Sequence, residues 1–243
     1  MKKITLYISA FAIVASMSSC KKETTTNTPQ SSTPTIATPS DADGAFIAVS
    51  TITEQTVPVV GTQIILVGTA VGGVFSSTGS ASYVDAGTVT VDGSTLTKQS
   101  NNSYLYTPGT TNPTGIDFDF STEWTASGPG LSYVHNSSFP SVGSLNSSTD
   151  VQTSGSYNIS VSSITGADSV LYIISGPNGS VQKTKAGNST TCSFTSSELA
   201  TLGTGDNQGL IQIAPYNWTS NVQGGKKYYF IKEAVLSKFV NLK

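Results

Sequence analysis

The sequence predicts an all-β protein built from two β-sandwich domains. After residue 44, short runs rich in Val, Ile, Thr and Tyr alternate with clusters of Gly, Asn, Ser and Pro. Charged residues make up only 11 % of the 243 residues, so hydroxyl and amide side chains supply most of the polarity. The most apolar stretch, 64–75, contains glycines and fits a buried strand better than a membrane helix, which needs about 20 apolar residues.

The first domain is predicted to span residues 41–145. Asp92-Gly93 lies between two alternating runs and predicts a hairpin, because a type I′ turn needs positive φ at both central positions. A later short strand is stopped by Thr107-Pro108-Gly109. Strands are expected over 46–53, 62–75, 88–91, 96–98 and 104–106.

The segment 116–124 has the clearest alternation in the chain. Period two is the pattern of a strand buried on one face, so we expect a strand with an acidic outer face. The apolar face consists of Ile116, Phe118, Phe120 and Trp124, and the polar face of Asp117, Asp119, Ser121 and Glu123.

The second domain is predicted to span residues 146–243, because the polar segment 143–155 breaks the strand rhythm. Its spacing of short strands is typical of an immunoglobulin-like sandwich. Thr195-Ser196-Ser197-Glu198 predicts a capping box at the start of a short helix that Gly203 can close. Residues 226–242 also fit a helical face, but the all-β context favours a strand broken by a bulge. The other strands are expected over 157–164, 169–175, 181–185, 191–194 and 210–214.

Residues 1–19 read as a signal peptide that ends at a lipidation site. Lys2 and Lys3 precede an apolar stretch, 4–15, that is too short to span a bilayer. Met17-Ser18-Ser19-Cys20 then has the form of a lipobox, with small residues before the cysteine. We therefore expect Cys20 to be diacylated and to anchor the chain in a membrane.

Residues 20–40 are predicted to be a disordered tether. Thr, Ser, Pro, Asn and Gln dominate the stretch, which cannot bury enough apolar surface to offset its chain entropy. Lys21 stands where an aspartate marks inner-membrane retention in enterobacterial lipoproteins. The expected location is therefore the outer membrane, at its periplasmic face or at the cell surface.

The leader, with Met17-Ser18-Ser19-Cys20-Lys21-Lys22, resembles lipoproteins of the Bacteroidota. Ala167-Asp168-Ser169-Val170 and Gly225-Lys226-Lys227-Tyr228-Tyr229 resemble segments of small uncharacterised lipoproteins of that phylum. The predicted domain shape resembles immunoglobulin or fibronectin type III modules, although the Cys-Trp-Cys pattern of antibody domains is absent. This resemblance implies an envelope location and carries over no catalytic residue.

Composition argues against several kinds of partner. The chain has no arginine, and removing the leader leaves ten lysines against fourteen acidic residues, a balance near −4. Nucleic acid is therefore not an expected partner, because its binding needs a basic surface. We also expect no cofactor. With Cys20 lipidated, Cys192 has no cysteine to pair with and is interpreted as a small buried side chain.

Few residues suggest catalysis or metal binding. His135 is the only histidine, and no Gly-x-Ser-x-Gly motif accompanies it, so we interpret it as structural. Asp41 and Asp43 alternate as in a calcium loop, but the later glutamate is missing and turn chemistry explains them better. Asp168-Ser169-Val170 matches a loose O-glycosylation triplet, which makes Ser169 a weak candidate for modification.

Aromatic residues near the end of the second domain form the candidate ligand site. Aromatic rings stack on the C–H faces of sugars, and Asn217, Thr219 and Asn221 lie nearby to bond hydroxyl groups. The alternative is ordinary packing in the core. The candidate ligand-binding residues are Tyr216, Trp218, Tyr228 and Tyr229.

The expected function is a membrane-anchored, non-enzymatic binding or structural module for glycans or envelope proteins. The alternative is a small β-sandwich glycan hydrolase that uses the acids of 117–123. Glycosidases need two carboxyl groups roughly 5–10 Å apart, and alternate residues of a strand lie about 7 Å apart, so the spacing allows it.

Overall fold

The fold is known from a computed structural model that describes residues 39–57 and 61–243, without the side chains of 53–63. The predicted signal peptide, Cys20 and the tether up to residue 38 lie outside this range. Among the described residues, no helix has the length and apolar character needed to cross a membrane.

The predicted all-β class is confirmed. One helix, α1 (Ser196–Leu199), accompanies the strands within the described part of the chain. The strands are β1 (Gly44–Val57), β2 (Gly61–Phe75), β3 (Tyr83–Val84), β4 (Val89–Val91), β5 (Ser94–Thr95), β6 (Thr97–Lys98), β7 (Tyr104–Tyr106), β8 (Ser121–Ala126), β9 (Leu131–Asn136), β10 (Ser141–Val142), β11 (Asp150–Val151), β12 (Tyr157–Ser160), β13 (Ile164–Thr165), β14 (Ser169–Gly176), β15 (Gly179–Ala186), β16 (Thr191–Phe194), β17 (Gly205–Gln223) and β18 (Lys226–Leu242).

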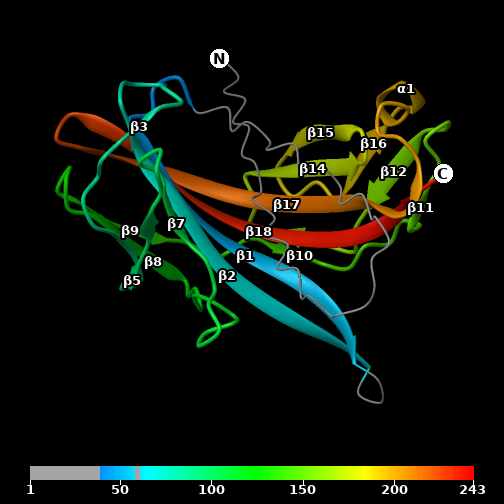
Figure 1. Cartoon of the computed structure of the whole chain (residues 1–243), viewed down its shortest axis with the longest axis horizontal. Helices are drawn as coiled ribbons and strands as arrows, with labels where there is room; N and C mark the ends of the chain where they lie inside the picture. Colours follow the sequence, from blue (N-terminus) through cyan, green and yellow to red (C-terminus); the bar gives the residue numbers. More distant parts are fainter. Residues whose placement is uncertain (1–38, 58–60) are drawn as a thin grey trace.

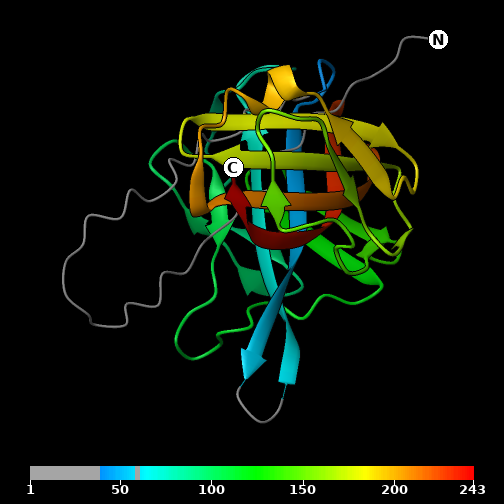
Figure 2. The same ribbon diagram turned by 90° about the vertical axis from the view of Figure 1, so that its right-hand side faces the viewer.

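A large sheet runs through the whole described structure in the order β15-β14-β17-β18-β1-β2-β7-β6, with β11 also paired to β18 and β3 to β2. The last strand, β18, lies in the middle, antiparallel to β17 and parallel to β1. The sheet is strongly twisted, since β1 and β2 cross the direction of β14 and β15 (Figures 1 and 2). The β1–β2 hairpin extends past the rest of the molecule at the bottom of both views.

Two hydrophobic cores lie on one face of this sheet. The first packs a four-stranded sheet, β5-β4-β8-β9, against β1, β2 and β18. The Phe46 ring lies at its centre, 5.3 Å from the Trp124 ring and 5.6 Å from the Phe230 ring, between centroids. The second core packs the strand pairs β12–β16 and β10–β13 against β14, β17 and β18.

A buried polar layer, formed by Lys232 and the two carbonyl groups that it binds, separates the two cores. Along β18, Phe230 belongs to the first core and Leu236 to the second, and between them on the same face lies Lys232. The Lys232 side chain is fully buried, and its Nζ donates to the carbonyl oxygens of Phe120 at 2.7 Å and Ser137 at 2.8 Å. Lys232 therefore fixes the two segments that enter and leave the β8–β9 hairpin.

The opposite face of the large sheet carries a third apolar cluster, with Ile47, Leu171 and Ile231 among its members. Glu233 also lies on this face of β18, opposite Tyr216 of β17 and Val49 of β1. Its side chain is fully buried, and neither carboxyl oxygen has a hydrogen-bond partner. Burial raises the pKa of Glu233 from its ordinary 4.5 to about 8.

The predicted boundary between residues 145 and 146 does not coincide with a break in the large sheet. β1 and β2 come from the first predicted domain, yet they share that sheet with β14, β17 and β18 from the second. Core membership changes slightly earlier, since Phe139 packs on the first core while Val142 belongs to the second. The division into two separately folding domains, with an immunoglobulin-like second one, stays a prediction.

The predicted strand over 116–124 is wrong in its first half, because β8 begins only at Ser121. The Gly68 N–H donates to the Thr114 carbonyl at 2.8 Å, and the Ile116 N–H donates to the Gly68 carbonyl at 3.1 Å. The chain is thus held beside β2 and then crosses to the four-stranded sheet over 117–120. Phe120 is 60 % exposed in this crossing, although the alternation predicted it to be buried.

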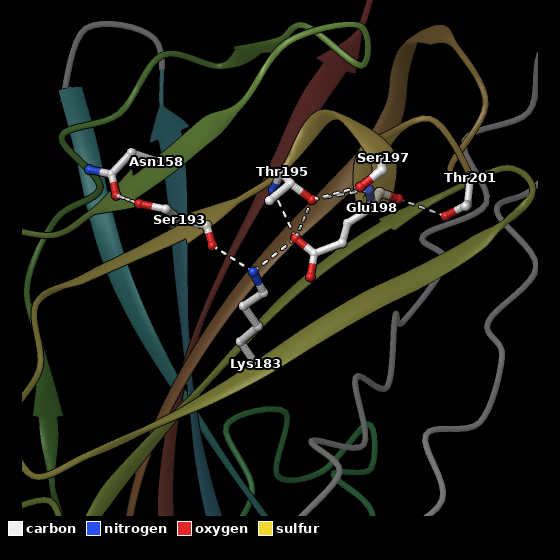
Figure 3. Close-up of polar contacts among 7 residues, drawn as sticks. All are labelled: Asn158, Lys183, Ser193, Thr195, Ser197, Glu198 and Thr201. Atoms are coloured by element: carbon white, nitrogen blue, oxygen red, sulfur yellow. Dashed lines mark hydrogen bonds and ion pairs between the residues drawn. The ribbon is translucent and has the colours of Figure 1, made fainter.

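Of two local predictions, the capping box is confirmed, and the segment 226–242 is confirmed as a strand but not as the site of a bulge. Thr195 caps α1, accepting from the Glu198 N–H, while Glu198 Oε2 accepts from the Thr195 N–H at 2.7 Å (Figure 3). Lys183 of β15 joins the same carboxylate at 2.8 Å, and this contact, with the capping bonds, lowers the pKa of Glu198 to about 2. Residues 226–242 form a strand as expected, but the bulge lies in β17, between Gly205 and Gly209.

Candidate functional site

Three of the four candidate ligand-binding aromatic residues lie in the cores. Tyr216 is 2 % exposed and Tyr228 and Tyr229 are each 1 % exposed, so their rings present no surface to a ligand. The physical reason is that β17 and β18 are central strands covered on both faces. Trp218 is 36 % exposed and is the one candidate ring that can contact a ligand directly.

A polar depression of about 460 Å³ adjoins Trp218. It lies where the exposed edge of β9 approaches the end of β17, next to the turn that leads into β14. Its lining is rich in hydroxyl, amide and imidazole groups, and consists of Tyr133, Val134, His135, Asn136, Ser137, Gly166, Asp168, Asn217, Trp218 and Thr219.

The depression exists because β17 is longer than its neighbour β14. The pairing of β14 with β17 ends at Ser169 and Tyr216, so the next residues of β17 need other partners. The Asp168 carboxylate continues the pairing by accepting from the Trp218 N–H at 3.0 Å. The turn before β14 is thereby fixed beside Trp218.

Side chains, rather than a backbone ladder, join β9 to β17. The Gln223 Nε2 donates to the Gly130 carbonyl at 2.6 Å, and the Tyr133 and Thr219 hydroxyl groups lie 3.3 Å apart. We call this side-chain junction the β9–β17 seam. Because it is made of single contacts, it leaves room for the depression between the strands.

Asn217 ties together the buried end of the seam. Its Nδ2 donates to the carbonyl oxygens of Ser138 at 2.9 Å and Gly166 at 3.0 Å. Its Oδ1 accepts from the Ser137 hydroxyl at 3.3 Å. Both hydrogens of the amide and one acceptor position of its oxygen are therefore used by the protein, which leaves Asn217 little capacity to bond a ligand.

His135 contributes to the floor but has the wrong surroundings for a catalytic base. It is 5 % exposed, and burial, with a smaller effect from the positive charge of Lys232, lowers its pKa to about 4. Its Nε2 lies 3.0 Å from the Ser137 hydroxyl oxygen. Because Ser137 donates to Asn217, the network favours a neutral ring that donates from Nε2 to Ser137.

The His135–Ser137 pair also lacks an orienting carboxylate. The remaining ring nitrogen, Nδ1, has no hydrogen-bond partner in the described structure, and Asp168 is used by Trp218. A Ser-His-Asp arrangement needs the carboxylate on that nitrogen. The predicted structural role of His135 thus agrees with its position between the seam and Lys232.

The acids of 117–123 do not share one strand. Asp117 and Asp119 precede β8, whereas Glu123 lies within it, and the Glu123 backbone N–H donates to Asp92 Oδ1 at 2.7 Å. Asp117 lines a separate groove beside β2. The same-strand geometry on which the hydrolase alternative rested is therefore wrong.

The other singled-out residues have structural contacts. Asp41 accepts from Lys227 Nζ at 2.7 Å and from the Tyr229 hydroxyl at 2.8 Å, while Asp43 accepts from the Thr78 hydroxyl at 2.6 Å. Cys192 is buried in the second core, where desolvation raises its thiol pKa. No group of three or more His, Cys, Asp or Glu side chains suited to a metal occurs in the described part of the chain.

Ser169 is half-buried at the start of β14, opposite Tyr216.

Comparison of the chain with protein-family models, with curated proteins and with solved structures found no match in any of the three.

Proposed function

We propose that this chain is an outer-membrane lipoprotein, anchored through Cys20, that binds a glycan at the Trp218 depression without chemical change to the ligand. The proposal rests on two neighbouring features of β17. One is a concave surface rich in hydroxyl, amide and carboxylate groups, and the other is the 36 % exposed Trp218 at its border. The Trp218 ring lies on the same face of the sheet as Tyr229, whereas Asn217 and Thr219 line the depression from the other face. An aromatic face with nearby hydrogen-bonding groups is suited to a ligand that has both C–H faces and hydroxyl groups.

Trp218 is held as a rigid platform. Its ring centroid lies 5.4 Å from that of Tyr229, with the planes tilted by 43°. Tyr229 is fixed in turn by its hydroxyl bond to Asp41 at 2.8 Å and by Lys227 Nζ, 5.0 Å from its ring centroid. Tyr229 thus supports the site from the core although it offers no surface of its own.

Several polar groups of the lining remain suited to a ligand. Asp168 and Asn136 are exposed, and the hydroxyl groups of Tyr133 and Thr219 can each make further bonds beyond their shared contact. The one histidine of the site is neutral at pH 7, so the depression presents amides, hydroxyls and a carboxylate. This set favours neutral sugars over acidic ones.

A glycan array tests the site, followed by calorimetric titration of any glycan that binds. Both experiments use the chain without its leader. Trp218→Ala should weaken binding at least about tenfold, or ~1.4 kcal/mol, with a small change in melting temperature. Val222→Ala is the matched control, because Val222 is 64 % exposed on the same strand and lies outside the depression. Equal binding by both variants and the native chain would exclude this site.

The anchor is tested separately by labelling cells with a radioactive or clickable fatty acid. The native chain should carry the label and partition into detergent, whereas Cys20→Ala should accumulate as unlabelled precursor with its leader. Label on the Cys20→Ala variant, or a native chain that is soluble without detergent, would contradict the proposed anchoring.

A further inference from the structure

The outer half of β2 is a free strand edge. Residues 61–67 pair with β1 on one side. On the other side, β2 meets its neighbours only farther along, at 70–72 with β7, at 74–75 with β3 and at Gly68 with Gly115. Within the described structure, the backbone N–H and C=O groups of 61–67 that point away from β1 therefore face solvent.

This edge lacks the features that usually prevent strand addition. Exposed edges in monomeric proteins are normally short or carry lysine or proline. The terminal strands of the same sheet follow that rule, since β15 contains Lys183 and Lys185, and β6 is two residues long and ends at Lys98. Residues 61–67, Gly-Thr-Gln-Ile-Ile-Leu-Val, contain neither a charge nor a proline.

Two large apolar side chains are exposed on this edge. Ile64 is 67 % exposed and Leu66 is 56 % exposed, and both lie on the same face of β2. Leu66 also borders a groove of about 480 Å³ whose lining includes Ile52, Ile116, Phe118 and Phe139. An added strand would bury Ile64 and Leu66 and extend the apolar wall of this groove.

We propose that the β2 edge pairs with the β2 edge of a second copy of this chain, in antiparallel register about a twofold axis. A twofold contact brings each residue next to itself or its near neighbours, so a charged segment would repel itself. Because 61–67 is uncharged, it meets this condition, which the lysine-bearing edges of β15 and β6 do not. With Ile65 on the axis, Ile64 of one copy lies opposite Leu66 of the other.

Cysteine cross-linking of the full chain in membranes tests the pairing directly. Ile65→Cys places two thiols across the proposed axis, within about 5.5 Å between Cβ atoms. Mild oxidation should therefore convert most of this variant to a disulfide-linked dimer. Val222→Cys is the control, since Val222 is apolar and 64 % exposed, more than the half-buried Ile65, but lies on β17. Cys192 is buried and should not react.

Analytical ultracentrifugation of the chain without its leader measures its oligomeric state independently. The native chain should show a concentration-dependent shift from monomer to dimer, and Leu66→Lys should remain monomeric with an unchanged circular dichroism spectrum. Phe239→Lys serves as the control, because Phe239 is 54 % exposed on β18, and it should dimerise like the native chain. A native chain that stays monomeric at its solubility limit, or equal cross-linking of the Ile65 and Val222 variants, overturns the proposal.

Discussion

Replacing Glu233 by Gln should make the protein more stable at neutral and mildly alkaline pH. Glu233 is fully buried on the third apolar cluster, and both its carboxyl oxygens lack a hydrogen-bond partner. The folded state therefore holds the protonated form up to about pH 8, whereas the unfolded chain ionises near the ordinary pKa of 4.5. Glutamine has nearly the same shape and does not ionise in either state.

The sign and size of the effect follow from proton linkage. Between pH 4.5 and about 8 the folded state binds one more proton than the unfolded state, so the free energy of unfolding falls as pH rises. The stabilisation is complete below pH 4.5 and is lost as pH rises to about 8. At about 1.4 kcal/mol per pH unit, the loss amounts to about 3 kcal/mol by pH 7 and about 5 kcal/mol by pH 8.

Urea unfolding of the native chain and of Glu233→Gln at a series of pH values measures this effect. The difference in unfolding free energy between the two proteins should grow with pH from 4.5 to 8 and then level off. Comparing the slope with pH, rather than the value at one pH, removes the constant cost of burying the glutamine amide. A difference that does not change with pH would refute the reasoning, because it would mean that Glu233 ionises alike in both states.

The other predictions concern the polar layer, the crossing at β2 and the domain boundary. Burial lowers the pKa of Lys232 from 10.5 to about 8, so above pH 8 the unfolded chain binds more protons than the folded chain, and the free energy of unfolding should rise from pH 8 towards pH 10. The native protein should therefore be least stable near pH 8. In the same urea titrations, Lys232→Met should not show the rise in stability above pH 8. Gly68→Ala would place a Cβ 1.8 Å from the Ile116 carbonyl oxygen, so its melting temperature should fall by about 10 °C or more, and an unchanged value would show that the crossing is not held there. Residues 146–243 alone should fail to give a dispersed amide NMR spectrum, because β18 would lose its partner β1 and expose Phe230; a well-dispersed spectrum would support two separate domains.

Local sequence patterns predicted much of the strand content. The bounds of β7, β16 and β18 match the predicted segments 104–106, 191–194 and 226–242. The Asp92-Gly93 turn has φ of 45° and 75°, as a type I′ turn requires. These features depend on residues that are close in sequence, so a single sequence contains the information for them.

The arrangement of the strands could not be predicted in the same way. β1 pairs with β18 through residues such as Gly44 and Tyr228, and no local pattern marks a partner so distant in the chain. The pairing places β18 in the middle of the sheet, where both of its faces are buried, so Tyr228 and Tyr229 lie in clusters on opposite faces. Trp218 is partly exposed because β17 continues past the last residue of β17 that pairs with β14, Tyr216. The difference in length between the two strands is also a tertiary feature.

The central place of β18 has a consequence for the order in which the protein can assemble. The strand comprises 17 residues at the carboxyl end of the chain, and it lies between the β1–β2 hairpin and the β14–β17 strands. During synthesis β18 emerges after the β1–β2 hairpin and after β14–β17, so the hairpin cannot pair with β18 until late. Contacts between such distant segments form slowly, because a long loop has to close first. A chain cut short before residue 226 would leave both hydrophobic cores open at once.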